Sequence, residues 1–422
     1  MDIAYARKFP AVGETEALDL DATLKQVLPE GAFARQREEE ERRGEAAAWR
    51  PPGLLKHTYE KNGRVFEIWA GTLLDPKVNA LVGNIQSLVL FFIEAGSLLN
   101  LREADWSLDR WRVYFVYEKV VGSGAAVSPY VLVGYATTYR FWHYVRSDVK
   151  LFAKKSSLEE LPAISPLTLP ARVRISQFIV LPPWQSAGHG SQLYETIHRD
   201  VRRDSTVSEL TVEDPSEEFD RLRDSCDWKD LRLLLRASKI AIDSTKLSTV
   251  KRIARVPTST LLNLDALKLI RQVTKIAPRQ FSRQVEMYLL AQIPFSHRSA
   301  GGANLTKLKI QKHTNKNSDD RTYYWWRILL KQRIYRKNKD VLIEADPEEK
   351  YAQIEDSARG QEDEYEGLLM GFALKQEDAD NAAVQASSSS STVRKRKAVV
   401  DDDDDEEEEE GDDEMRSKRA KS

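Results

Sequence analysis

The chain has 422 residues, of which 41% are hydrophobic and 31% are charged, a balance typical of a soluble protein with two or three domains. Its longest apolar run, residues 88–93, is too short to cross a bilayer, and the polar residues behind Asp2 are unlike a secretory leader. Cys226 is the single cysteine, and the six histidines lack zinc-binding spacing, so we expect neither disulfides nor a metal site.

The net charge of −2 conceals two opposite parts. Residues 401–414 are acidic except for one glycine, so the rest of the chain is net basic. A basic body can meet nucleic acid, but this tail would compete for the same surface, and we expect no direct nucleic-acid binding. The tail from about residue 376 has almost nothing to bury, which predicts disorder.

In the first half of the chain, apolar residues recur with helical period from residue 78 to residue 93. Leu90, Phe91 and Ile93 make the last turns apolar on every side, which predicts that this helix end is buried. Glu94 follows directly, in apolar company.

Strand-like alternation follows, with β-branched and aromatic residues prominent. The predicted strands cover residues 111–117, 130–144, 172–181 and 209–213, and a helix over residues 188–203 lies between the last two. This order, with antiparallel hairpins ahead of a strand–turn–helix–strand unit, predicts an α/β domain with a mixed sheet.

After residue 228 the pattern is wholly helical, with helices predicted over residues 262–277, 280–293 and 323–340. A helix-turn-helix DNA reader around Pro278 is conceivable, but the segment lacks a glycine turn and a basic recognition face, which favours plain bundle packing. Trp325 and Trp326 fit a buried core or an interface better than a ligand cage.

The most informative motif is the glycine turn between the strand over 172–181 and the helix over 188–203. A strand that ends in such a turn and opens into a helix directs unpaired N–H groups and the helix dipole at one point, which suits a pyrophosphate. Gly188 and Gly190 allow close backbone approach, and we interpret His189 as a loop residue that acts through its backbone N–H.

A second motif places Glu213 and Asp214 at the end of a strand, before Pro215. Adjacent carboxylates at the carboxyl end of a strand lie where α/β sheets usually carry their sites. The alternative is an ordinary helix N-cap by Asp214 or Ser216, and the two interpretations are compatible.

Together with these motifs, several spaced segments resemble the catalytic subunit of type B histone acetyltransferases, within the Gcn5-related N-acetyltransferase superfamily. The similarity covers roughly residues 5–370 and is specific because the segments occur in the right order. They are R-I-S-Q at 174–177, Q-S-A-G-H-G-S at 185–191, V-E-D-P at 212–215, L-R-D at 222–224, F-I-E at 92–94, D-R-W at 109–111 and V-G-Y at 133–135.

The resemblance implies transfer of acetyl from acetyl-CoA to a lysine in the tail of free, newly made histone. It assigns Glu213 as the general base, with Glu94 and Asp214 as helpers. The implied cofactor-binding residues are Phe178, Ile179 and Val180 for the pantetheine arm, Gln185, Ser186, Ala187, Gly188, His189, Gly190 and Ser191 for the pyrophosphate, and Ser216 near the thioester. The implied substrate-binding residues are Trp111, Tyr139, Arg140 and Phe141.

This chemistry needs a base because a lysine ammonium, with a pKa of about 10.4, cannot attack a thioester until it loses a proton. We expect Glu213 to lie in a partly apolar pocket, where a carboxylate becomes a stronger base. Direct attack is favoured over a covalent route through Cys226, which has no histidine nearby in sequence and fits a small buried residue.

The resemblance also predicts an N-acetyltransferase fold in four parts. These are a truncated N-terminal substrate-binding domain over residues 1–75, an acetyltransferase domain over 76–228, a C-terminal helical domain over 229–375 and a disordered tail over 376–422. Relatives usually carry further strands ahead of the segment that matches Met1. The 298–320 loop resembles an insertion.

The implied partner is a WD-repeat histone chaperone subunit, and we expect no membrane contact. Residues 394–397 fit a nuclear import signal or a solvated basic cluster, and the implied location is the nucleus and the cytoplasm. Two alternatives stay open: an acetyltransferase for another amine, and a histone-binding scaffold with weak catalysis.

Overall fold

The computed structural model describes residues 19–28, 49–120, 128–143, 167, 169–243, 245, 258–302 and 317–395. The described residues fall in two compact units, one that ends at Leu368 and one that begins at Leu369. The acidic run, for which disorder is predicted, lies outside the described residues. So do most of the 298–320 loop and most of the sequence before residue 49.

In the described part of the chain, six strands form one mixed sheet in the order β1-β2-β3-β4-β5-β6. Neighbours are antiparallel from β1 to β5, and β5 and β6 are parallel. This confirms the predicted α/β class. The strands are β1 Leu54–Lys61, β2 Arg64–Thr72, β3 Trp111–Lys119, β4 Tyr130–Trp142, β5 Ala171–Val180 and β6 Val207–Val212.

The hairpin β1–β2 was not among the predicted strands. Its turn is Asn62-Gly63, with φ of 51° and 72°, which suits the tight turn that joins two twisted strands. Because β2 pairs with β3 over residues 65–72, this hairpin extends the same sheet that carries β5 and β6. The predicted division at residue 75 stays a prediction.

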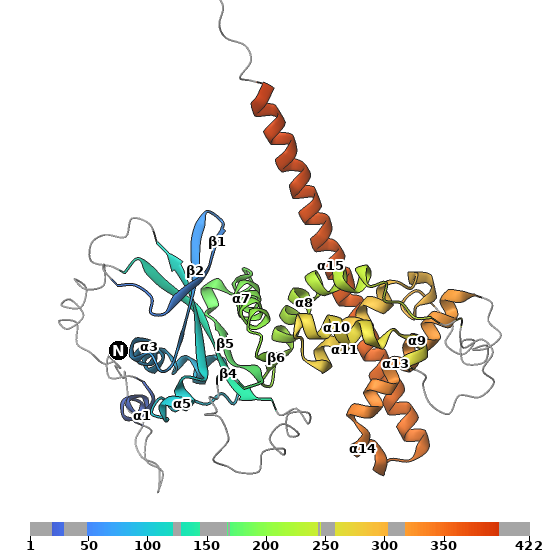
Figure 1. Cartoon of the computed structure of the whole chain (residues 1–422), viewed down its shortest axis with the longest axis horizontal. Helices are drawn as coiled ribbons and strands as arrows, with labels where there is room; N and C mark the ends of the chain where they lie inside the picture. Colours follow the sequence, from blue (N-terminus) through green and yellow to red (C-terminus); the bar gives the residue numbers. More distant parts are fainter. Residues whose placement is uncertain are drawn as a thin grey trace, which may run out of the picture. The chain divides into compact units, whose positions relative to one another are not determined.

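Helices cover both faces of the sheet (Figure 1). One face carries α3 Pro76–Ile85, α4 Leu88–Phe92 and α5 Asp105–Leu108, with a core that includes Val78, Val82, Phe115 and Ile179. The other carries α7 His189–Arg203 and α8 Glu217–Ala237. Its core includes Phe66, Ile175, Leu193 and Ile197.

The helix predicted over residues 78–93 is interrupted at Gln86-Ser87 and forms α3 and α4. Asp75 caps α3 by accepting a hydrogen bond from Lys77 N, and Pro76 follows at the first helical position. Leu90, Phe91 and Phe92 are 44%, 60% and 44% exposed, so the predicted burial of this helix end is wrong.

The described chain after residue 228 is mainly helical, as predicted, but its last helix begins at Pro347 and continues to Lys395, through residues 376–395 for which disorder is predicted. The further elements are α1 Leu20–Val27, η3 Pro182–Trp184, α9 Thr258–Leu261, α10 Leu264–Thr274, α11 Pro278–Ala291, η5 Phe295–His297, α13 Ser318–Lys337, α14 Lys339–Glu344 and α15 Pro347–Lys395. Trp326 is fully buried and its Nε1 donates to Glu286 O, which confirms its predicted core position.

Buried ion pairs join these helices. Asp224 of α8 is 1% exposed and accepts hydrogen bonds from Gln280, Arg283 and Gln284 of α11. Arg327 of α13 contacts Glu362 of α15, and both side chains are almost inaccessible. Burial raises the pKa of Glu362, and hydrogen bonding from Tyr323 and the charge of Arg327 oppose that rise.

We expect Arg327→Met to destabilise the helical region by about 3–5 kcal/mol, because it leaves the Glu362 carboxylate buried without its cation. The matched control is Arg359→Met, whose pair with Asp356 is exposed. That control should cost less than about 1 kcal/mol. Denaturant unfolding followed by tryptophan fluorescence measures both, and equal costs would contradict the assignment.

Candidate functional site

The glycine turn lies between β5 and α7, as predicted. Pro182–Trp184 forms a 3-10 turn, Ser186 and Gly188 have φ of 57° and 84°, and Gly188 is the N-cap of α7. The first helical bond is from Gln192 N to Gly188 O, so the N–H groups of the preceding residues of α7 have no partner within the helix. These groups form an anion-binding position at the dipole's positive end.

His189 is a helix residue rather than a loop residue. It is the first residue of α7, it is 3% exposed, and its Nδ1 lies 2.7 Å from Tyr59 OH, within hydrogen-bond distance. Burial lowers its pKa, and the nearby charges of Lys61 and Arg64 lower it further. The ring therefore anchors the start of α7 to β1.

A β-bulge in β5 defines the centre of the site. Thr137 of β4 lies opposite Gln177 and Thr138 lies opposite Ile175, so Ser176 is the extra residue. The extra residue reverses the alternation of side chains: Ile175 belongs to the core under α7, whereas Ile179, four residues later, belongs to the core under α3.

The bulge coincides with the point where β5 leaves β6. Their ladder ends with Ile175 opposite Val212 and a 2.9 Å hydrogen bond from Glu213 N to Ile175 O. Beyond it, Gln177 N and Leu181 N both donate toward β4, so by alternation Phe178 and Val180 direct their backbone groups to the open edge. Ile179, also predicted to bind the pantetheine arm, directs its backbone toward β4.

One group of this open edge is already bonded within the protein. Gln185 Nε2 donates a 2.8 Å hydrogen bond to Val180 O, which ties the first residue of the predicted phosphate-binding turn to β5. The remaining edge groups of Phe178 and Val180, together with the start of α7, border the same gap between β5 and β6.

The predicted acids lie at the mouth of this gap. Ser176 Oγ donates a 2.7 Å hydrogen bond to Glu213 Oε2, so the bulge residue orients the carboxylate. Asp214 has φ of 33°, and Ser216 accepts a hydrogen bond from Phe219 N as the N-cap of α8. Glu213 is exposed, so the partly apolar pocket expected for it is not formed by the described residues.

Glu94 belongs to the face of the sheet that carries α3 and α4. It is exposed and follows α4, and the segment behind it is fixed by a 3.0 Å hydrogen bond from Gln177 Nε2 to Ser97 O. Neighbouring bulge residues, Ser176 and Gln177, thus bind the segments that carry Glu213 and Glu94. The sequence gives no signal for either role, because a bulge is not visible in the pattern.

The predicted substrate-binding residues separate into two groups. Trp111, Tyr139 and Phe141 form an aromatic cluster, with ring centroids 4.6 Å and 4.7 Å apart. Arg110 and Arg174 each lie 4.7 Å from a ring centroid, over Tyr139 and Phe141. The cluster is therefore covered by two cations.

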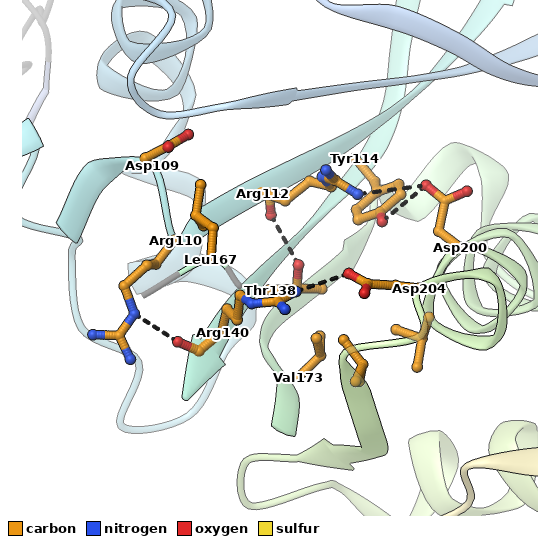
Figure 2. A pocket seen from close by; sticks show the side chains of 12 residues that line it. Asp109, Arg110, Arg112, Tyr114, Thr138, Arg140, Leu167, Val173, Asp200 and Asp204 are labelled. Atoms are coloured by element: carbon orange, nitrogen blue, oxygen red, sulfur yellow. Dashed lines mark hydrogen bonds and ion pairs between the residues drawn. The ribbon is translucent and has the colours of Figure 1, made fainter. Parts of the chain in front are cut away.

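Arg140 belongs to a pocket at the other end of α7 (Figure 2). Its guanidinium pairs with Asp204 at 2.8 Å, while Asp200 pairs with Lys56 at 2.9 Å and accepts from Tyr114 OH at 3.2 Å. These pairs join β1, β3 and β4 to α7. The charges of Arg140, Asp200 and Asp204 therefore have a structural role, because each has a partner within the protein. The predicted substrate role of Arg140 stays a prediction.

Cys226 is 7% exposed, in agreement with the expectation of a small buried residue, and burial raises the pKa of its thiol to about 12. Among the described residues no cluster of three or more histidine, cysteine or acidic side chains could hold a metal ion. None of the described helices is long and apolar enough to span a membrane.

Comparison with known proteins agrees with these features. A family model for the N-terminus of histone acetyl transferase HAT1 matches residues 1–94. The histone acetyltransferase type B catalytic subunit of Aspergillus oryzae is 42% identical over 381 residues, which cover 89% of this chain and 75% of that protein. The proteins of the same name from Aspergillus fumigatus and Emericella nidulans are each 43% identical, over 67% and 77% of their lengths and 89% of this chain.

Among solved structures, an aminoglycoside acetyltransferase from an uncultured soil metagenomic sample, in complex with sisomicin, is 14% identical. The match covers 45% of this chain and 93% of that chain, with a TM-score of 0.23. Likeness at that level has no bearing on fold or function.

Gly190→Ala tests the close packing at the start of α7. A Cβ there would lie 2.7 Å from Leu222 Cδ1 and 3.6 Å from Phe178 Cε1. We expect it to cost about 1–3 kcal/mol of unfolding free energy by overpacking. Gly360→Ala is the control, because open space surrounds its Cβ, and it should stabilise its helix by about 0.5–1 kcal/mol. Thermal unfolding of both variants measures the difference, and a stable Gly190→Ala would contradict it.

The lowered pKa of His189 predicts a pH dependence of stability. Below its unfolded pKa of about 6.5, the unfolded chain binds a proton more readily than the folded protein. The contribution of His189 to the stability of the folded protein is therefore present above about pH 6.5. It is lost as the pH falls toward the pKa that His189 has in the folded protein. Melting temperatures of the wild type and His189→Gln, measured from about pH 8 to pH 5, should converge on acidification. Parallel curves would exclude this role.

Proposed function

Because this chain belongs to the family of type B histone acetyltransferase catalytic subunits, which are acyltransferases, we propose that it transfers acetyl from acetyl-CoA to a lysine of a histone tail. The observation that carries this proposal is the gap between β5 and β6, with Glu213 fixed on the bulge at its mouth.

Acetyl-CoA suits this gap along its length. The amide groups of a pantetheine arm can pair with the edge groups of Phe178 and the N–H of Val180, much as a missing strand would. A pyrophosphate suits the N–H groups at the start of α7. The acetyl group would then lie toward the bulge, near Ser176, Glu213 and Ser216.

Glu213 is the proposed general base. Glu213 first takes a proton from the lysine ammonium, and the free amine then bonds to the thioester carbonyl carbon. As the C–S bond breaks, a second proton of the nitrogen passes to the departing sulfur, which leaves as the CoA thiol. The reference pKa values are about 10.4 for a lysine ammonium and about 4.3 for a glutamic acid. Proton transfer between the isolated groups is therefore uphill by about 8 kcal/mol. Desolvation of the ammonium between substrate and protein must therefore lower its pKa.

The surroundings of Glu94 support such desolvation. Phe91, Phe92 and Leu98 present exposed apolar surface on either side of it. A tail laid across this surface would remove water from the lysine stem, while Glu94 and Asp214 attract its charge. Exposed acids in the free protein therefore fit a site that is completed by its substrate.

A covalent intermediate on Cys226 is disfavoured by the state of that residue. With a pKa of about 12 the thiol carries almost no thiolate at neutral pH, and the side chain is buried. Direct attack needs neither a nucleophilic thiol nor a second acyl transfer.

The substrate is proposed to be free, newly made histone, with the cluster of Trp111, Tyr139 and Phe141 as part of the binding surface. Arg110 and Arg174 over these rings would have to move or bind a tail carbonyl, because cations repel a basic tail. A WD-repeat histone chaperone as partner, and a location in both nucleus and cytoplasm, belong to the same proposal and rest on family likeness alone.

Glu213→Gln should reduce kcat for acetylation of free core histones by about 10²–10⁴-fold, the usual contribution of a general base, with little change in acetyl-CoA binding. Ser176→Ala should reduce kcat less, because it loosens the carboxylate without removing it. Glu348→Gln, an exposed acid in α15, serves as the control. Transfer of labelled acetyl, combined with calorimetric binding of acetyl-CoA, measures both quantities.

Three outcomes would overturn parts of this proposal. Unchanged kcat in Glu213→Gln would exclude it as the base. Transfer to small amines but not to histones would indicate an acetyltransferase for another amine. Binding of histone without acetyl transfer, by a protein that binds acetyl-CoA, would indicate a scaffold.

A further inference from the structure

The strand β1 presents a row of side chains to the start of α7. His57 Nε2 and Gln192 Oε1 are 3.0 Å apart, and Tyr59 OH lies 2.7 Å from His189 Nδ1. Residues 57, 59 and 61 alternate with solvent-facing positions, so they share one side of the strand. The row runs along α7 toward its first residue.

Lys61 is the last member of this row, next to the tight turn of the hairpin. A Cβ placed on Gly188 would lie only 2.7 Å from Lys61 Nζ. The ammonium therefore lies over the N-cap of α7, beside the unpaired N–H groups of its first turn.

The other cation of the hairpin is occupied. Arg64 lies opposite Lys61 in the hairpin and binds Glu118 through Nε at 2.6 Å and through Nη2. Trp184 Nε1 also donates to Glu118, at 3.3 Å, so this carboxylate is shared between the hairpin and the glycine turn. For Lys61, no hydrogen bond or ion pair is found to any described residue.

We propose that Lys61 is a cofactor-binding residue whose ammonium contacts the pyrophosphate of acetyl-CoA. The inference rests on the proposed function and adds a side-chain cation to a site otherwise made of backbone groups. The contacts of His57 and Tyr59 with α7 position the strand, so the lysine is held near the phosphates before the ligand arrives.

Charge balance supports this role. A pyrophosphate linker carries two negative charges, whereas a helix N-terminus supplies the equivalent of about half a positive charge. An ammonium on a flexible stem is a point charge that can follow either phosphate, as phosphate-binding lysines commonly do. Lys61 thus makes the hairpin β1–β2 part of the cofactor site.

The test compares the wild type with Lys61→Met, which keeps the length of the side chain and removes its charge, and with Lys61→Arg. We expect Lys61→Met to weaken CoA binding roughly 10- to 150-fold, the usual value of a charge-assisted hydrogen bond, and Lys61→Arg to retain most affinity. Lys77→Met, an exposed lysine of α3, is the control and should bind as the wild type does. Isothermal titration calorimetry with CoA measures all four proteins.

Two further ligands separate binding from a structural role. The loss in Lys61→Met should persist with 3′-dephospho-CoA, which keeps the pyrophosphate, and should vanish with pantetheine, which has no phosphate. A loss that also appears with pantetheine would indicate damaged structure and overturn the inference. A loss that disappears with 3′-dephospho-CoA would place the contact on the 3′-phosphate and also overturn it.

Failure of the inference is distinguishable from failure of the proposed function. If the wild type binds CoA and Lys61→Met binds it equally well, Lys61 is excluded while the cofactor site stands. If the wild type itself binds no CoA, the proposed acetyl transfer is wrong and the comparison of variants has no signal.

Discussion

The separation of β5 from β6 after Ile175 is the constraint on which the rest of the site depends. A sheet normally keeps its backbone groups paired, and unpaired groups that lose water are costly. Here the bulge at Ser176 turns β5 away at the point where the parallel ladder ends. The consequence is an open strand edge directly beside the start of α7, so backbone donors and acceptors from two elements face one gap. A long polar ligand can satisfy both at once.

The same bulge determines where the acids lie. Ser176 and Gln177 are neighbours in the chain, and their side chains bind the segments that carry Glu213 and Glu94. Val212 packs in the core under α7, so by alternation Glu213 points to the other face, which carries α4 and the Glu94 segment. A single irregularity in one strand therefore couples the geometry of two carboxylates that are far apart in sequence.

Much of this arrangement could be predicted from the sequence, and the failures have physical reasons. The strands β3, β4, β5 and β6 and the helix α7 were predictable because period and turn chemistry agree there. The hairpin β1–β2 was missed although Asn62-Gly63 is a strong hairpin signal, since charged residues in β1 mask its alternation. Leu90 and Phe91 were expected to be buried, but apolar composition does not reveal which face another element covers. The sequence could have shown that Arg140 lies on the other face of the sheet from Tyr139 and Phe141, because successive side chains of a strand alternate between the two faces. The sequence could not have shown the orienting role of Ser176, because a β-bulge depends on how the strands pair in the folded protein.

The hairpin also changes what the N-terminal segment does. It pairs with β3, it contributes Phe66 and Ile68 to the core under α7, and its turn reaches the glycine turn through Arg64, Glu118 and Trp184. A cut at residue 75 would leave β3 as an unpaired edge and expose that core. The segment is therefore structurally inseparable from the sheet that carries the gap. The exposed residues Phe91 and Phe92 lie next to Glu94 in the chain, and in the proposed reaction a ligand between β5 and β6 would form one wall of the lysine site. In the proposed reaction, catalysis would depend on surfaces that the protein, acetyl-CoA and the histone tail complete together.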